Sequence, residues 1–289
     1  GDIQFMKKHS SLIGGAAIGL LAVMVSFQVR EAQALGNPAK DFVPPIVFQA
    51  AGPTVASIQS SFADYQAKLG ANNGNAQGPL GTGHREINWD GGNPNNQTTT
   101  VSANPFAGFQ VTRGALFTTP DGSGFVQAPA AADPVLFPPG GLAGLFNNPT
   151  YGTIFTAFSP SRLFSAIGSN ITEVDFFVPG GGNTRATVAS FGAVFSDVDQ
   201  PDGGGSGNKH IARTLMEYFD ANGELLFSSF VPASPGDGGL SFFGIVFEDA
   251  RIARVRITSG KVAPGADDGG KQDVVMMDDF IYSEPQPLP

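Results

Sequence analysis

Aspartates at the end of one predicted strand and near the start of another are the first residues that could do chemistry. Asp197 and Asp199 are two positions apart at a strand end, so both carboxylates should face one side. Asp278 is a further candidate at the head of the last predicted strand; alternation should turn its neighbour Asp279 the other way. Calcium takes about six to eight oxygen ligands of this kind. We therefore predict a calcium site at Asp197, Asp199 and Asp278, with acidic turn residues that merely face water as the alternative.

The segment 84–90 has the most unusual local composition in the chain. It contains the only tryptophan, Trp89, together with Arg85 and Asp90. An aromatic plate beside polar donors and acceptors is typical of sugar-binding surfaces. These three residues are therefore predicted to bind a ligand, and a structural anchor built around a buried tryptophan is the alternative.

Glu173 and Asp175 resemble part of the strand signature of retaining jelly-roll glycosidases, in which carboxylates alternate along one strand. Retention requires two carboxyl groups about 5 to 5.5 Å apart. Phe177 or Val178 stands where the second glutamate would be, so no proton donor is evident. The sequence also lacks the serine elbow, the zinc-protease motif and the phosphate-binding loop. We therefore expect a protein without enzymatic activity.

The composition favours a β protein with many turns. The 289 residues include 39 glycines and 22 prolines, only 14 % are charged, and none is cysteine. Few lysines, glutamates and arginines are available to build solvent-facing helices. The formal net charge of −9 has the wrong sign for a phosphate backbone, so nucleic acid is not an expected partner.

Residues 1–34 are predicted to comprise a signal peptide and the residues upstream of it. Lys7 and Lys8 precede an apolar run over residues 12–27, and Ala32-Gln33-Ala34 follows as a small-residue cleavage pattern. The apolar run is shorter than the ~20 residues that span a bilayer. We therefore expect a secreted or cell-surface protein with no stable membrane span in the mature chain. Without disulfides, its stability should come from core burial and calcium.

One helix and a series of strands are expected in the mature chain. Apolar residues at spacings of three and four predict a helix over residues 53–70. After position 170, short apolar segments separated by Gly, Asp, Asn and Pro predict an antiparallel β-sandwich of the jelly-roll kind. The seven predicted strands are 171–178, 186–195, 214–219, 225–231, 240–247, 252–257 and 274–282.

The expected organisation has three parts after the signal peptide. Residues 35–150 should hold the helix and an irregular β region, residues 151–284 the sandwich, and residues 285–289 a proline-rich tail. The Ala-, Pro- and Gly-rich stretch 128–149 marks the division.

Five motifs in order give the chain a family resemblance. They are FGAVFSDVD at 191–199, MEYFDANG at 216–223, LSFFGI at 240–245, IARVRI at 252–257 and MDDFIY at 277–282. Residues 170–285 thereby resemble exported bacterial jelly-roll proteins, many of which carry a PEP-CTERM sorting tail, and residues 285–289 are like the proline-rich lead-in to such a tail. The resemblance implies a jelly-roll fold and export.

Three functions are compatible with these observations. The leading hypothesis is an exported, non-enzymatic sandwich that binds extracellular or cell-surface material, a glycan or another surface polymer, with calcium fixing its loops. A structural component of an envelope or matrix is the alternative, because low charge and high glycine content suit it as well. A polysaccharide hydrolase of the jelly-roll type is the third, kept open by Glu173 and Asp175.

Overall fold

The structure is a computed structural model that describes residues 43–199, 214–234, 236–266 and 272–288. All of these belong to one compact unit, Val43–Pro289. The predicted signal peptide therefore lies outside the described residues. Among those residues, no helix combines the length and the apolar character needed to cross a bilayer.

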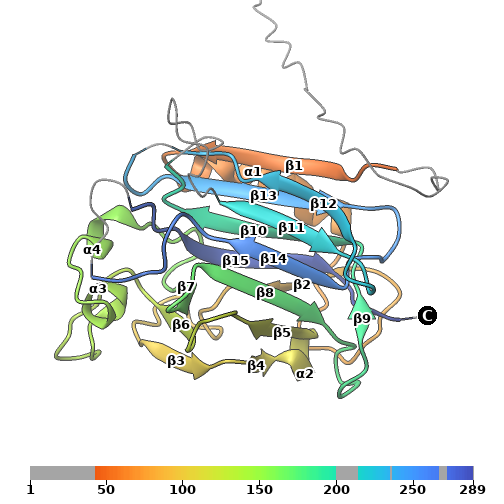
Figure 1. The fold of residues 1–289 in the computed structure, drawn as a ribbon, viewed down its shortest axis with the longest axis horizontal. Coiled ribbons are helices and arrows are strands. Elements are labelled where there is room, and N and C mark those ends of the chain that lie inside the picture. Colours follow the sequence, from red (N-terminus) through yellow and green to blue (C-terminus); the bar gives the residue numbers. More distant parts are fainter. Residues whose placement is uncertain (1–42, 200–213, 235, 267–271, 289) are drawn as a thin grey trace, which may run out of the picture. The chain divides into compact units, whose positions relative to one another are not determined.

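Two antiparallel sheets packed face to face form the fold, as predicted (Figure 1). The larger sheet has eight strands in the order β1-β13-β10-β15-β7-β6-β3, with β2 pairing the end of β15. Its strands are β1 (Ile46–Gly52), β2 (His84–Ile87), β3 (Thr100–Ala103), β6 (Gly124–Ala128), β7 (Leu163–Ile167), β10 (Ser190–Ser196), β13 (Leu240–Val246) and β15 (Met276–Ser283).

The smaller sheet has six strands in the order β12-β11-β14-β8-β5-β4. Its strands are β4 (Phe106–Phe109), β5 (Ala115–Thr118), β8 (Ile171–Phe176), β11 (Leu215–Phe219), β12 (Leu225–Phe230) and β14 (Arg254–Thr258), and a separate pair joins β9 (Ala186–Thr187) to β16 (Gln286–Pro287). Each of the seven predicted strand regions contains a strand. Strands between residues 46 and 128 enter both sheets.

The core between the sheets is filled mainly by aromatic and β-branched side chains. Phe164 lies between the rings of Trp89 and Phe125, stacked on both at centroid distances of 3.7 and 5.3 Å. Period-two alternation along the strands produces this core, because every second side chain points inward. Burying that apolar surface is the main stabilising contribution in a chain without disulfides.

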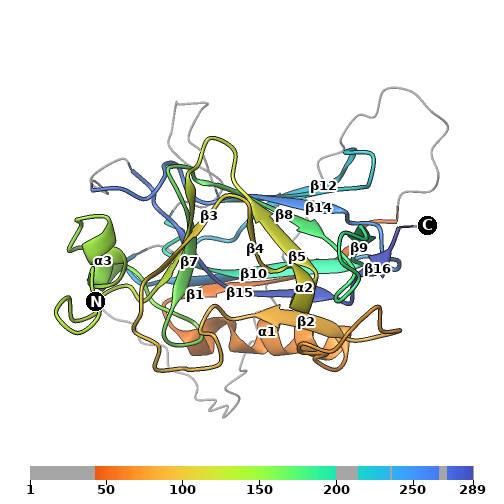
Figure 2. The same cartoon turned by 90° about the horizontal axis from the view of Figure 1, so that it is seen from below.

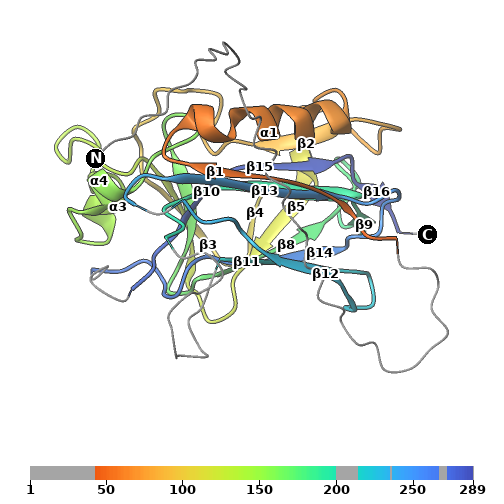
Figure 3. The same ribbon diagram turned by 90° about the horizontal axis from the view of Figure 1, so that it is seen from above.

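The helix α1 (Val55–Leu69) covers the outer face of the larger sheet (Figures 2 and 3). Its buried residues, Ile58, Phe62 and Tyr65, recur at helical spacing, and Gly70 with φ +88° ends it, which confirms the predicted helix. Three shorter helices lie elsewhere in the described chain: α2 (Gln110–Arg113), α3 (Gly141–Leu145) and α4 (Tyr151–Ile154).

Two glycines on neighbouring strands seat α1 against the sheet. Gly192 of β10 faces Gly244 of β13, and Tyr65 lies over the pair with its hydroxyl donating to the Ile245 carbonyl at 3.1 Å. A Cβ atom at Gly244 would come within 3.0 Å of the Tyr65 ring, and one at Gly192 within 3.1 Å. The close approach of helix and sheet therefore depends on the missing side chains.

Candidate functional site

Trp89 lies inside the sandwich. It is 1 % exposed, and edge-on contacts with Phe117 and Phe280 add to its stacking on Phe164. Stacked and edge-to-face aromatic pairs stabilise a core beyond the area they bury. The residue predicted to present an aromatic plate to sugars is therefore a core residue.

Arg85 is fully buried in an ion pair with Glu284, which directly follows β15. Its Nε and Nη2 each donate to one carboxylate oxygen over 2.6 Å. Its Nη1 donates to the carbonyls of Gly74 and Ala76 at 2.9 and 2.7 Å. A bidentate pair of this kind fixes both partners, so Arg85 ties the loop before β2 to the end of β15.

Asp90 also makes its contacts within the protein. It is 1 % exposed, and its Oδ1 accepts hydrogen bonds from the backbone N–H groups of Ser161 and Arg162 at 2.8 and 2.9 Å. Arg85, Trp89 and Asp90 are therefore all engaged internally, and the structure does not join them into an exposed ligand-binding surface.

Asp278 and Asp279 lie on the same side of β15, contrary to the alternation expected from the sequence. A β-bulge in the pairing of β15 with β10 leaves Asp279 without an opposite residue. Asp278 accepts the backbone N–H groups of Phe158 and Ser159 at 2.7 and 3.2 Å, and Asp279 accepts the Ser159 hydroxyl at 2.5 Å. Burial raises the pKa of both carboxyls, to about 6 for Asp279, and the charge of Asp279 further raises that of Asp278.

The register between β10 and β15 separates Asp278 from the other predicted calcium ligands. Val194 faces Asp278, and the two strands are antiparallel. This pairing ends with Ser196 opposite Met276, and Asp197 and Asp199 lie beyond that end. Asp197 lies three residues beyond Val194, or about 10 Å along the strand direction.

Asp197 instead has Asp199, Asp237 and Asp273 as its acidic neighbours. Burial, and then the charges of these three residues, raise the pKa of Asp197 to about 8. Burial and the charge of Asp199 raise the pKa of Asp273 to about 6. Across the described ranges, no three carboxylate or imidazole groups already stand in a geometry that would hold a metal ion.

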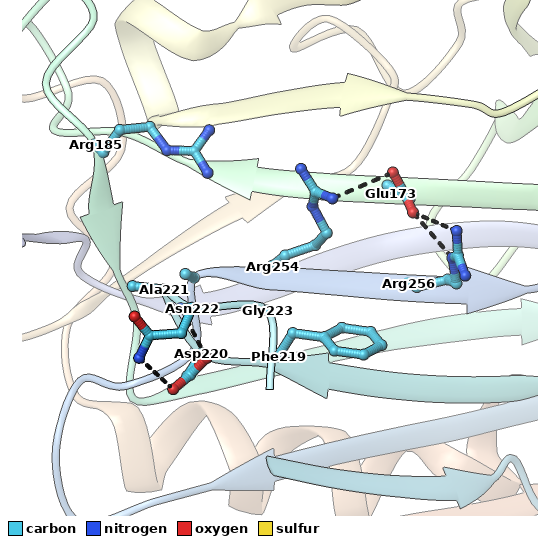
Figure 4. A pocket seen from close by; sticks show the side chains of 10 residues that line it. Glu173, Arg185, Phe219, Asp220, Ala221, Asn222, Gly223, Arg254 and Arg256 are labelled. Carbon is cyan, nitrogen blue, oxygen red and sulfur yellow. Dashed lines mark hydrogen bonds and ion pairs between the residues drawn. The ribbon is translucent and has the colours of Figure 1, made fainter. Parts of the chain in front are cut away.

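A row of arginines covers the outer face of the smaller sheet (Figure 4). Alternation turns Glu173 and Asp175 of β8 outward, and the register of β14 places Arg256 opposite Glu173 and Arg254 opposite Asp175. Arg256 Nε donates to Glu173 at 2.9 Å. Arg254 Nε and Nη2 donate to the two oxygens of Asp175 at 3.0 and 3.1 Å, and these hydrogen bonds raise the pKa of Arg254.

Arg185 continues this row beyond the end of β8. Its Nη2 donates to Asp175 at 3.1 Å, and its guanidinium lies 5.2 Å from the ring centroid of Phe177. Phe177, at a position considered for the second glutamate of a glycosidase, is therefore a cation–π platform. The side chains of Arg185, Arg254 and Arg256 remain 45 %, 43 % and 39 % exposed.

The arginines line an open cavity of about 350 Å³ together with Glu173, Phe219 and the turn 220–223 between β11 and β12. We call this cavity the arginine groove. Asp220 at its rim is occupied by its own turn, since its carboxylate accepts the backbone N–H groups of Asn222 and Glu224 at 2.8 Å each. The groove therefore offers guanidinium donors fixed from beneath by two carboxylates.

Sequence reasoning did not predict the arginine groove. The sequence does contain a signal for it. Glu173 and Asp175 are two positions apart on one strand, and Arg254 and Arg256 are two positions apart on another, so the acidic side chains face the basic ones if the two strands are antiparallel neighbours. Arg185, from the β8–β10 connection, had no such signal.

No protein-family model matches the chain, and neither a curated protein nor a solved structure shows significant similarity to it.

Proposed function

We propose that this chain is an exported, non-enzymatic protein that binds extracellular glycans, and that the arginine groove is its binding site. The observation that carries the proposal is the row of three partly exposed guanidinium groups held in place by Glu173 and Asp175. Arg185 Nε and Nη1 and Arg256 Nη1 have no hydrogen-bond partner among the described residues, so they can donate to sugar hydroxyls and carboxylates.

The guanidinium donors of the groove suit acidic sugars. Three guanidinium groups balance the carboxylates of Glu173, Asp175 and Asp220, so the preference rests on geometry, because a planar guanidinium matches the two oxygens of a uronate carboxylate. Phe219 adds apolar surface at the wall, against which a sugar ring can pack. The predicted signal peptide and the resemblance to exported jelly-roll proteins support a secreted or cell-surface location.

Binding fits the two carboxylates of the groove better than hydrolysis does. A retaining glycosidase needs one carboxyl group that keeps its proton to protonate the leaving group. Glu173 and Asp175 each accept hydrogen bonds from arginines, so their oxygens are engaged within the protein and not free to act on a substrate. Fixed in ion pairs, they serve to position guanidinium groups.

A glycan array that includes neutral and uronate-containing polysaccharides tests this function on the full chain. We expect selective binding of acidic glycans, and an affinity about 10- to 100-fold weaker for Arg185→Ala, because a hydrogen bond to a charged group contributes about 1.5–3 kcal/mol.

Arg251→Ala is the matched control, since Arg251 also pairs with an aspartate, Asp249, and also lies over a phenylalanine ring, at 5.1 Å from its centroid. It lies outside the groove and should leave binding unchanged. Failure of the wild-type chain to bind any glycan, or equal losses in both variants, would refute the proposal.

A further inference from the structure

Three segments of backbone meet just beyond the end of β10. The N–H of Asp197 donates to the Gly239 carbonyl at 2.8 Å, and the N–H of Ser234 donates to the Val198 carbonyl at 2.9 Å. On the other side, the carboxyl group of Asp273 accepts a hydrogen bond from the backbone N–H of Asp199. Main-chain hydrogen bonds thus fix the backbone that carries the acidic residues of this junction.

Two carboxylate oxygens in this junction are buried without a partner. Asp197 is 6 % exposed and Asp273 is 8 % exposed, and the Oδ1 atom of each lacks a hydrogen bond within the described part of the chain. Buried polar atoms are nearly always hydrogen-bonded, and a buried charge without compensation is strongly unfavourable. Two such atoms in one junction indicate a positive group that binds there.

The charges around these two oxygens also favour a bound cation. Asp199 and Asp237 add two further carboxylates, and Gly236 N–H approaches Asp199 Oδ1 at 3.4 Å. Lys261 is the one basic residue whose charge acts on Asp273 among the described residues. Counted over the part of the chain that the structure describes, four acidic residues and one lysine leave an excess of negative charge, which a divalent cation would neutralise.

We infer that Asp197 and Asp273 bind a calcium ion through their buried Oδ1 atoms. Because no third carboxylate already converges on them, main-chain carbonyls and water would complete the oxygen shell, and calcium accepts such irregular sets better than magnesium does. This assignment keeps Asp197 from the sequence prediction, replaces Asp278 with Asp273, and does not depend on glycan binding at the arginine groove.

Calorimetric titration and thermal unfolding of the full chain at pH 7.5, in calcium, magnesium or a chelator, test this site. We expect one calcium ion per chain, and a melting temperature about 5–10 °C higher when calcium is 100-fold above its Kd. Asp197→Asn and Asp273→Asn should each weaken calcium binding at least about tenfold, because each removes a charge while keeping an oxygen.

Asp279→Asn is the control for the removal of a buried acid, since Asp279 lies in the separate pair on β15 and should leave the calcium affinity unchanged. In chelator, Asp197→Asn should melt above the wild-type chain, because an uncompensated buried acid is lost, and this result also shows that the variant folds. Absence of calcium binding by the wild-type chain, or an unchanged Kd in both Asp197→Asn and Asp273→Asn, would overturn the inference.

Discussion

Replacing Arg85 with methionine should be one of the most destabilising single changes in this protein. The substitution keeps much of the apolar stem but leaves the Glu284 carboxylate buried, with Asn73 Nδ2 at 2.8 Å and Leu80 N–H at 3.1 Å as its remaining partners. Breaking a buried ion pair by removing one member costs about 3–5 kcal/mol. Total stabilities are only about 5–15 kcal/mol, so we expect a large fall in the unfolding midpoint.

A double-mutant cycle in urea measures the effect and its origin. Arg85→Met and Glu284→Gln should each lower the unfolding free energy by about 3–5 kcal/mol, or the melting temperature by about 6–20 °C. The double variant should lose less than the sum of the two, with a coupling of at least about 1 kcal/mol.

The exposed pair Arg251–Asp249 supplies the comparison, because a surface ion pair contributes about 0–1 kcal/mol. If Arg85→Met were no more destabilising than Arg251→Met, the buried pair would not tie the loop before β2 to the end of β15. Strict additivity in the cycle would be equally damaging to this reasoning.

Three further variants probe other parts of the structure. Without calcium, Asp197 keeps its proton in the native state up to about pH 8, whereas in the unfolded chain it loses that proton near pH 4. Between these pH values the unfolding free energy should therefore fall as pH rises, by up to about 1.4 kcal/mol per pH unit. Asp197→Asn should flatten this slope between pH 6 and 8 in chemical denaturation, and an unchanged slope would exclude Asp197 as its source. Gly244→Ala should cost about 1–3 kcal/mol by pushing Tyr65 away from the sheet, whereas Gly81→Ala, at a glycine without a positive φ and with no atom within 4 Å of the added Cβ, should cost much less; equal losses would show that Tyr65 is not involved. Glu173→Gln removes one negative charge from the arginine groove but keeps an oxygen that can accept the Arg256 hydrogen bond, so it should tighten binding of acidic glycans about 2- to 10-fold, as measured by calorimetry; a loss of binding would refute the preference of the groove for negative charge.

The helix and strands in which apolar residues recur at regular spacing could be predicted from the sequence. The helical spacing of Ile58, Phe62 and Tyr65 predicted α1, and alternation after position 170 predicted the strands of the sandwich. Strands such as β2 and β3 are only four residues long, and four residues are too few to show a period.

The candidate sites were harder to predict because they depend on register and burial. Asp273 becomes a neighbour of Asp199 only in the folded chain, where the Asp199 backbone N–H donates to its carboxyl group, and the bulge beside Asp279 suspends the alternation that the prediction assumed. Trp89 was singled out by its rarity, which carries no information on which way the side chain points. Burial is a property of the whole fold, so composition alone did not reveal it.

The contact between α1 and its sheet has a consequence for how the sequence can change during evolution. Gly192, Gly244 and Tyr65 fit one another as a set: an alanine at Gly244 would require a smaller side chain at position 65, and an alanine at Gly192 would also press on the backbone of Gly244. We expect the three positions to covary across homologous sequences, so that two small residues accompany an aromatic one. The triplet could thus identify distant members of the lineage whose sequences have otherwise diverged.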